Sequence, residues 1–109
     1  MNILFVCSEC RLRSPTAAAV CDEWEGVEAT SAGTNADALT PLSGDLIEWA
    51  DVILVMEEVH RRKVAQRYRE LLRGKKLAVL GVADRYRYMD PELVDLVERI
   101  VPRYLGGVR

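Results

Sequence analysis

Residues 1–20 constrain the fold of this chain more than any other part of the sequence. They begin with the apolar run Ile3-Leu4-Phe5-Val6, which predicts a buried β-strand. A helix is expected over residues 15–24, because Ser14 can cap it and Pro15 suits its first position. A strand-to-helix loop must lie between them, with the sequence Cys7-Ser8-Glu9-Cys10-Arg11-Leu12-Arg13-Ser14. Such a loop directs backbone N–H groups and the positive end of a helix dipole toward one place, which favours an anion.

Three side chains of this loop suit chemistry on an anion. Cys7 ends the strand, where nearby N–H groups and Arg13 would stabilise a thiolate and make it a nucleophile near neutral pH. Arg13, six residues later, can bind a tetrahedral oxyanion through two hydrogen bonds. Ser14 can donate a hydrogen bond to the sulfur and help it to leave. The loop therefore predicts a nucleophilic cysteine beside an anion site.

The rest of the chain repeats the alternation of strand and helix. Further strands are expected over residues 27–31, 52–55 and 77–80, and further helices over residues 40–50, 57–74 and 90–105. This order predicts an α/β fold, a three-layer doubly wound four-stranded parallel sheet with helices on both faces. The 109 residues suit a single domain, residues 1–109. Ligands of such sheets bind at the carboxyl ends of the strands, where Cys7 lies.

Composition and charge exclude several classes of protein. The net charge of −2 gives no bias toward nucleic acid, and no apolar run approaches the length of a membrane span. Charged residues interrupt the apolar start of the chain, so no signal peptide is expected and the cytoplasm is the expected location. Three cysteines are an odd count that does not predict a disulfide framework. Cys21 is expected to be a buried helix residue.

Two further features have both a structural and a functional interpretation. Residues 61–76 hold eight of the 15 Lys and Arg residues, which suits a solvated helix face or a docking patch for an acidic or phosphorylated partner. His60, the only histidine, has no cysteine or carboxylate at the spacing of metal ligands. It is expected on a helix surface or packed against the sheet.

On these residues the chain resembles the low-molecular-weight protein tyrosine phosphatases, in particular a short bacterial branch of that family. The spacing Cys-x5-Arg-Ser is followed directly by Pro15-Thr16-Ala17, as in the family. Later stretches agree in order: Ser31-Ala32-Gly33-Thr34, the strand that ends at Met56, and a loop with aspartate before the last helix. The resemblance implies a hydrolase that forms a phosphocysteine intermediate.

The resemblance also implies roles for single residues. Cys7 would attack phosphorus and Arg13 would stabilise the phosphoryl oxygens, with phosphate bound by the loop residues Ser8, Glu9, Cys10, Arg11, Leu12, Arg13 and Ser14. Neither a metal nor a cofactor is expected, because amides and a guanidinium supply the electrostatics. The implied substrate is a phosphorylated protein or a small aryl phosphate, and inorganic phosphate is the implied product. No nucleic-acid or membrane partner is expected.

The proton donor for the leaving group is an aspartate before the final helix in the family, and two residues compete for this role. Asp90 precedes Pro91 as in the family, but this position also suits a helix cap. Asp84 precedes Tyr86, lies in the loop after a strand, and has no such capping role, so we favour it as the general acid. For the substrate pocket, the candidate walls are Thr34, Tyr86 and Tyr88, for which turn formation and cover of the core are the alternative interpretations.

The sequence departs from the family pattern in the loop itself. An asparagine that braces the loop is replaced by Cys10, and a second cysteine is replaced by Leu12. Residues 34–41 are also fewer than in longer relatives. Cys10 is either a small residue that a tight loop tolerates or a redox partner that forms a reversible disulfide with Cys7.

Two alternatives to a phosphatase follow from the same loop. A thiol-dependent oxyanion reductase of the arsenate type would share the fold and anion loop, but it needs resolving cysteines and none follows Cys21. A catalytically silent phosphate-binding module would explain the substitution at Cys10, but not the presence of Cys7, Arg13 and Ser14 together.

Overall fold

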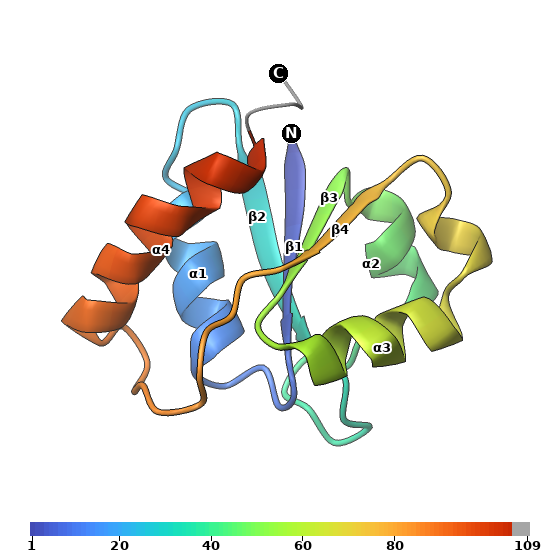
Figure 1. Cartoon of the computed structure of the whole chain (residues 1–109), viewed down its shortest axis with the longest axis horizontal. Coiled ribbons are helices and arrows are strands. Elements are labelled where there is room, and N and C mark those ends of the chain that lie inside the picture. The colour runs from blue at the N-terminus through green and yellow to red at the C-terminus, as the bar shows by residue number, and fades with distance from the viewer. Residues whose placement is uncertain (106–109) are drawn as a thin grey trace.

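Four parallel strands form one sheet in the order β2-β1-β3-β4 (Figure 1). The computed structural model describes residues 1–105, so residues 106–109 of the expected domain lie outside the described part. The strands are β1 (Asn2–Cys7), β2 (Glu28–Gly33), β3 (Val52–Val55) and β4 (Lys76–Val79). The expected parallel α/β fold is confirmed.

The helices cover both faces of this sheet. They are α1 (Arg13–Cys21), α2 (Gly44–Trp49), α3 (Glu58–Arg67) and α4 (Pro91–Leu105), with a short 3-10 helix η1 (Glu70–Leu72) after α3. Figure 1 shows α1 and α4 together on one face, and α2 and α3 together on the other. The chain therefore folds as the three layers that the alternating pattern predicts.

β1 is the centre of the hydrophobic core, because its side chains alternate between the two faces of the sheet. Ile3 and Phe5 pack with the apolar residues of α1 and α4, and both are fully buried. Leu4 and Val6 pack on the opposite side with Ile47 of α2 and other buried residues. A strand buried on both faces needs an uninterrupted apolar run, which explains the sequence between Ile3 and Val6.

The strand order places the end of β1 at a point where the connections diverge. The chain leaves β1 toward β2 on one side, and β3 pairs with β1 on the other. Cys7 lies in register with Gly33 at the ends of β1 and β2. The loop after Cys7 consequently lies at the carboxyl-terminal end of the sheet, where ligands of such folds bind.

Several element boundaries differ from those expected. α2 begins at Gly44, where the Ser43 side chain accepts a hydrogen bond from the Leu46 N–H, and not at Thr40. Pro41 instead forms a parallel bridge with Gly33, which keeps the chain extended there. The helix expected over residues 57–74 ends at Arg67, and η1 follows separately. Within residues 1–105, no helix is long and apolar enough to span a membrane.

Candidate active site

The loop between β1 and α1 surrounds the Cys7 sulfur with hydrogen-bonding groups. The Cys7 side chain is buried, with 3% of its surface exposed. Its Sγ lies 2.9 Å from Ser14 Oγ and accepts a hydrogen bond from the Cys10 N–H at 3.2 Å. When the sulfur is a thiolate, the Ser14 hydroxyl is also a donor, since a thiolate can only accept. The two groups then stabilise negative charge on sulfur.

The sharp turn of the loop depends on the backbone of Cys10 and on Gly33. Cys10 has a φ of +57°, in the left-handed region that a non-glycine residue rarely adopts. Gly33 lies against the loop so closely that a Cβ at this position would lie 2.5 Å from Ser8 O and 3.0 Å from Cys10 N. Three backbone N–H groups beyond β2, those of Thr34, Asn35 and Leu39, donate to carbonyls of the loop at 2.9 Å.

The Cys10 thiol points to a different partner from the nucleophile. Its Sγ donates a hydrogen bond to Ser31 Oγ at 3.2 Å, and the side chain is buried. Cys7, Cys10 and Cys21 are all free thiols in this structure. Cys21 is buried in α1, and burial, together with the charge of Glu98, raises the pKa of its thiol to about 12. Cys21 therefore remains a neutral thiol at physiological pH.

Arg13 is the buried cation of the site, with 4% of its side chain exposed. Its Nη1 donates to Glu57 Oε1 at 2.6 Å and to the Val82 carbonyl at 2.9 Å. Its Nε lies 3.7 Å from Asp84 Oδ1. The guanidinium is thus held by groups from two other segments, the residue before α3 and the loop after β4. Because it is already ordered, an anion that binds it loses less conformational entropy.

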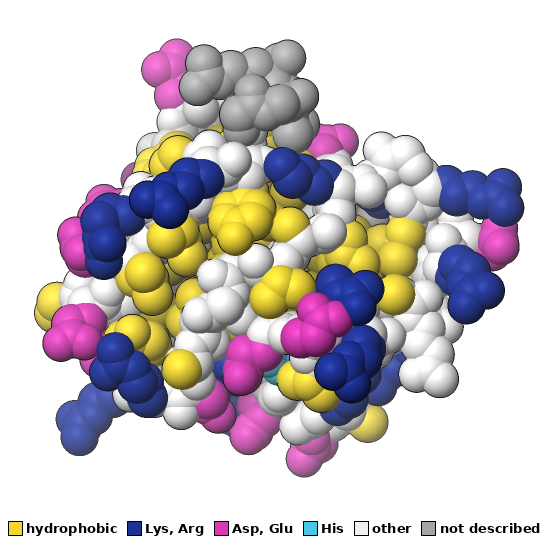
Figure 2. Space-filling view, viewed as in Figure 1, with side chains coloured by type: hydrophobic (Ala, Val, Ile, Leu, Met, Phe, Trp, Pro, Cys, Tyr) yellow, Lys and Arg dark blue, Asp and Glu magenta, His cyan; other side chains and the backbone are white. Residues whose placement is uncertain are grey.

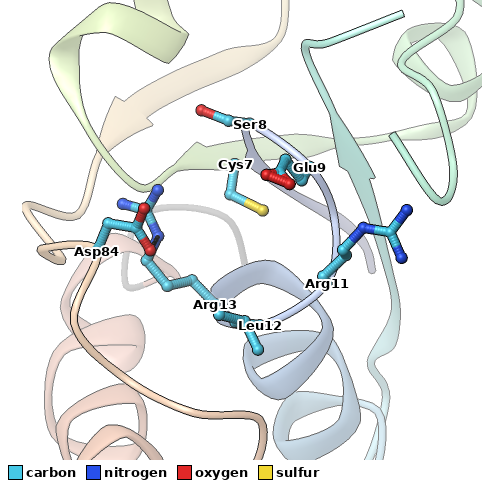
Figure 3. A pocket seen from close by; sticks show the side chains of 7 residues that line it. All are labelled: Cys7, Ser8, Glu9, Arg11, Leu12, Arg13 and Asp84. Atoms are coloured by element: carbon cyan, nitrogen blue, oxygen red, sulfur yellow. Dashed lines mark ion pairs between the residues drawn. The ribbon is translucent and has the colours of Figure 1, made fainter. Parts of the chain in front are cut away.

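These groups form a pocket of about 190 Å³ at the loop (Figure 3). It is lined by Cys7, Ser8, Glu9, Arg11, Leu12, Arg13 and Asp84. In Figure 3 the Cys7 sulfur lies between Asp84 on one side and Arg11 on the other. The pocket therefore brings a thiol, a buried guanidinium and a carboxylate together, as a site for an anion with an acid beside it would require.

The two candidate acids lie in different environments. Asp84 lines the pocket, and 68% of its side chain is exposed. Asp90 lies at the start of α4, where its Oδ1 accepts a hydrogen bond from the Glu92 N–H at 2.9 Å and its carbonyl accepts from the Val94 N–H. Asp90 thus serves as a helix cap.

The three candidate pocket walls do not line this pocket. Thr34 is buried, and its hydroxyl has no hydrogen-bond partner within the described residues. Tyr86 packs into the core on the α4 side of the sheet, and its hydroxyl accepts a hydrogen bond from Arg85. The side chain of Tyr88 is 54% exposed. The pocket is lined instead by Glu9, Arg11 and Leu12, in addition to Cys7, Ser8, Arg13 and Asp84.

Two residues of the site were not predicted from the sequence. Glu57 holds Arg13, and His60, which was expected on a surface or in sheet packing, is fully buried beside the loop. The His60 Nε2 lies 2.9 Å from Ser8 Oγ, and its Nδ1 accepts the Glu57 N–H at 3.0 Å. Burial and the charge of Arg13 lower the pKa of His60 to about 4. The signal in the sequence is a capping box, an N-cap Glu57 with a polar His60 three residues later, directly after an apolar strand.

No protein-family model and no curated protein sequence matches this chain. Solved structures do match, over nearly the whole chain. The YwlE arginine phosphatase from Geobacillus stearothermophilus is 25% identical, with a TM-score of 0.76 over 97% of this chain and 94% of that one. A Cys-to-Ser variant of YwlE with a phosphorylated active-site serine is also 25% identical, with a TM-score of 0.74 over 100% and 98%.

Two further neighbours carry the name of tyrosine phosphatases. The tyrosine phosphatase Wzb from Escherichia coli K30 in complex with phosphate is 22% identical, with a TM-score of 0.77 over 99% of this chain and 98% of that one. A low-molecular-weight protein tyrosine phosphatase from Bacillus subtilis is 25% identical, with a TM-score of 0.71 over 100% and 99%. The resemblance predicted from the sequence is confirmed: the chain is similar in structure to low-molecular-weight protein tyrosine phosphatases over nearly its whole length.

Proposed function

We propose that this chain is a cysteine-dependent phosphomonoester hydrolase of the protein-tyrosine-phosphatase type. One observation carries the proposal: Cys7, whose Sγ contacts Ser14 Oγ and accepts from the Cys10 N–H, lines the same pocket as the buried Arg13 and the exposed Asp84. The solved neighbours support a phosphatase over the two alternatives, because they are named as tyrosine and arginine phosphatases. In one of them the residue that replaces a cysteine is a phosphorylated active-site serine.

The first half of the reaction transfers the phosphoryl group to sulfur. The Cys7 thiolate attacks phosphorus, and the bond between phosphorus and the ester oxygen breaks. The leaving oxygen keeps that electron pair and takes a proton from the carboxyl group of Asp84, which lines the same pocket. Arg13 and the backbone N–H groups of the loop stabilise the charge on the other phosphoryl oxygens.

The second half releases phosphate. Asp84, now a carboxylate, accepts a proton from water, whose oxygen attacks phosphorus while the bond between phosphorus and sulfur breaks. The sulfur leaves as a thiolate, and the Ser14 hydroxyl at 2.9 Å donates a hydrogen bond to it. Inorganic phosphate is the product. The reaction needs no change of oxidation state.

The reductase alternative is less consistent with the positions of the cysteines. A reductase must resolve its arsenic–sulfur adduct with a second thiol. The Cys10 thiol donates a hydrogen bond to Ser31 Oγ, and Cys21 is buried in α1. The binding-module alternative does not explain the contact between Cys7 Sγ and Ser14 Oγ, because binding alone needs no hydroxyl to stabilise a leaving thiolate.

The three cysteines are free thiols, one of them the proposed nucleophile, and free thiols persist in a reducing compartment. We therefore propose the cytoplasm as the location.

The proposed substrate class is phosphotyrosine in proteins or a similar small aryl phosphate. The test is hydrolysis of para-nitrophenyl phosphate and of a phosphotyrosyl peptide in the presence of reductant and EDTA. We expect turnover that the Cys7→Ser variant lacks, and Cys21→Ser is the matched control because Cys21 lies in the core. Turnover that survives Cys7→Ser would refute the mechanism. No turnover by the wild type, with phosphate still protecting Cys7 from alkylation, would favour a binding module.

A further inference from the structure

His60 connects the anion loop to the start of α3 through both nitrogens of its ring. It is fully buried although it is polar. The ring lies between Ser8, the residue after the nucleophile, and Glu57, the residue before α3, with Nε2 2.9 Å from Ser8 Oγ and Nδ1 3.0 Å from the Glu57 nitrogen. When both polar atoms of a buried side chain are hydrogen-bonded, they restrict the groups that they contact to one arrangement.

The two contacts determine the position of the imidazole proton. The backbone N–H of Glu57 can only donate, so Nδ1 of His60 must be unprotonated. A neutral imidazole then carries its proton on Nε2, which donates to Ser8 Oγ. Burial and the nearby Arg13 lower the pKa of His60 to about 4, in agreement with a neutral ring at physiological pH.

The chain of contacts continues from Glu57 back to the loop. The carboxylate of Glu57 holds Arg13 Nη1 at 2.6 Å, and Arg13 follows the loop that begins at Cys7. The loop is therefore tied to α3 near both of its ends, at Ser8 through His60 and at Arg13 through Glu57. Figure 3 shows the Ser8 hydroxyl turned away from the Cys7 sulfur, so this tie acts on the shape of the loop and not on sulfur directly.

We propose that His60 is a positioning residue of the phosphate site, which holds Ser8 through Nε2–H and Glu57 through Nδ1, and thereby fixes the loop amides and Arg13 in the geometry that binds a phosphoryl group. The inference rests on the proposed phosphatase function for its role in turnover. Its effect on phosphate binding is independent of turnover.

The test measures the dissociation constant of inorganic phosphate from the protection of Cys7 against alkylation, followed by mass spectrometry at Cys7. Ser8→Ala removes one hydrogen bond, and we expect phosphate binding to weaken about two- to tenfold. His60→Phe removes both ring contacts at similar volume, and we expect a loss of about tenfold or more. His60→Gln offers one acceptor and one donor, and we expect binding closer to that of the wild type.

The double variant separates positioning from general stability. If His60 acts on the loop through Ser8, the effects of Ser8→Ala and His60→Phe will not add. Ser43→Ala is the matched control, because Ser43 caps α2 away from the pocket. It should lower the thermal midpoint without changing the dissociation constant of phosphate. Additive effects, or a His60→Phe variant that folds and binds phosphate like the wild type, would overturn the proposal.

A measurement on the wild type covers the case in which His60→Phe does not fold. Nitrogen-15 spectra of the imidazole should show a protonated Nε2 and an unprotonated Nδ1, both with and without phosphate. A proton on Nδ1 would overturn the proposal without any variant. Because neither readout depends on turnover, failure of this inference is distinct from failure of the proposed function.

Discussion

At the scale of single residues, Asp84 and Asp90 show how the same side chain can lie in two different environments. Asp84 lines the pocket near Arg13, whereas Asp90 accepts a backbone N–H at the start of α4. Because an asparagine cannot donate the proton that a leaving oxygen needs, Asp84→Asn should lower kcat for a phosphotyrosyl peptide by about 10² to 10⁴-fold. Asp90→Asn should leave kcat within about twofold, because asparagine also caps helices well. The larger loss in Asp90→Asn would reverse the assignment.

The buried His60 should make the stability of the protein depend on pH. The pKa of His60 in the folded protein is about 4, below the ordinary value of 6.5, because of burial and of Arg13. Between these values the unfolded chain binds more protons, so stability should fall as pH falls from about 6.5 to about 4. The loss should be roughly 2 to 3 kcal/mol.

The measurement for His60 is urea unfolding of the wild type and of His60→Gln at several pH values. The carboxylates titrate in both proteins, so the difference between the two curves isolates the histidine. A difference that stays flat across this range would show that the ring titrates normally in the folded state.

At the scale of elements, the end of β2 shapes the loop that follows β1. A Cβ on Gly33 would lie 2.5 Å from Ser8 O and 2.6 Å from the Ala38 Cβ. Gly33→Ala should therefore lower the free energy of unfolding by about 1 to 3 kcal/mol and weaken phosphate binding, since the loop must move. Gly44→Ala is the control: its Cβ would lie 3.3 Å from the end of the Leu71 side chain and 3.9 Å from the Tyr68 ring, so phosphate binding should stay unchanged. Equal phosphate affinity in both variants would contradict this role of Gly33.

Element order was predictable because it depends on local patterns. The apolar runs of β1 and β3 predict a parallel sheet with a loop at Cys7, as the structure shows. The cap predicted at Ser14 is wrong: α1 begins at Arg13 after Leu12, and the Ser14 hydroxyl lies beside Cys7 Sγ instead. The start of α2 was not predictable in this way, because the bridge that keeps Pro41 extended is made with Gly33 at the end of β2 and not with its immediate neighbours.

For the candidate site, too, the residues that are contiguous in the sequence were predictable, and those joined only by tertiary contacts were not. The loop from Cys7 to Ser14 is continuous in the sequence, and the structure places these residues together. Glu57 and His60 come from α3 and its cap, so only tertiary structure reveals their contacts with Arg13 and Ser8. Tyr86 was a reasonable wall from its place in the loop, but its ring is buried in the core.

At the scale of the whole molecule, the proposed anion site joins segments that the sheet brings together from most of the chain. The pocket and its supports include β1, the start of α1, the residue before α3 and the loop after β4. A ligand that contacts all of these segments favours the folded state over the unfolded chain, in which the segments are far apart. Binding of phosphate should therefore appear as global stabilisation.

Inorganic phosphate should consequently raise the thermal midpoint of unfolding. At a phosphate concentration about 100 times the dissociation constant, the expected stabilisation is about 2.7 kcal/mol. For a domain of this size, that corresponds to a rise of roughly 10 °C or more. The rise should persist in Cys7→Ser, which keeps the loop, and should be largely lost in Arg13→Met, which removes the buried guanidinium. Differential scanning calorimetry with sulfate and chloride as comparison salts separates specific binding from general salt effects. An equal rise in wild type and Arg13→Met would place the phosphate outside this pocket.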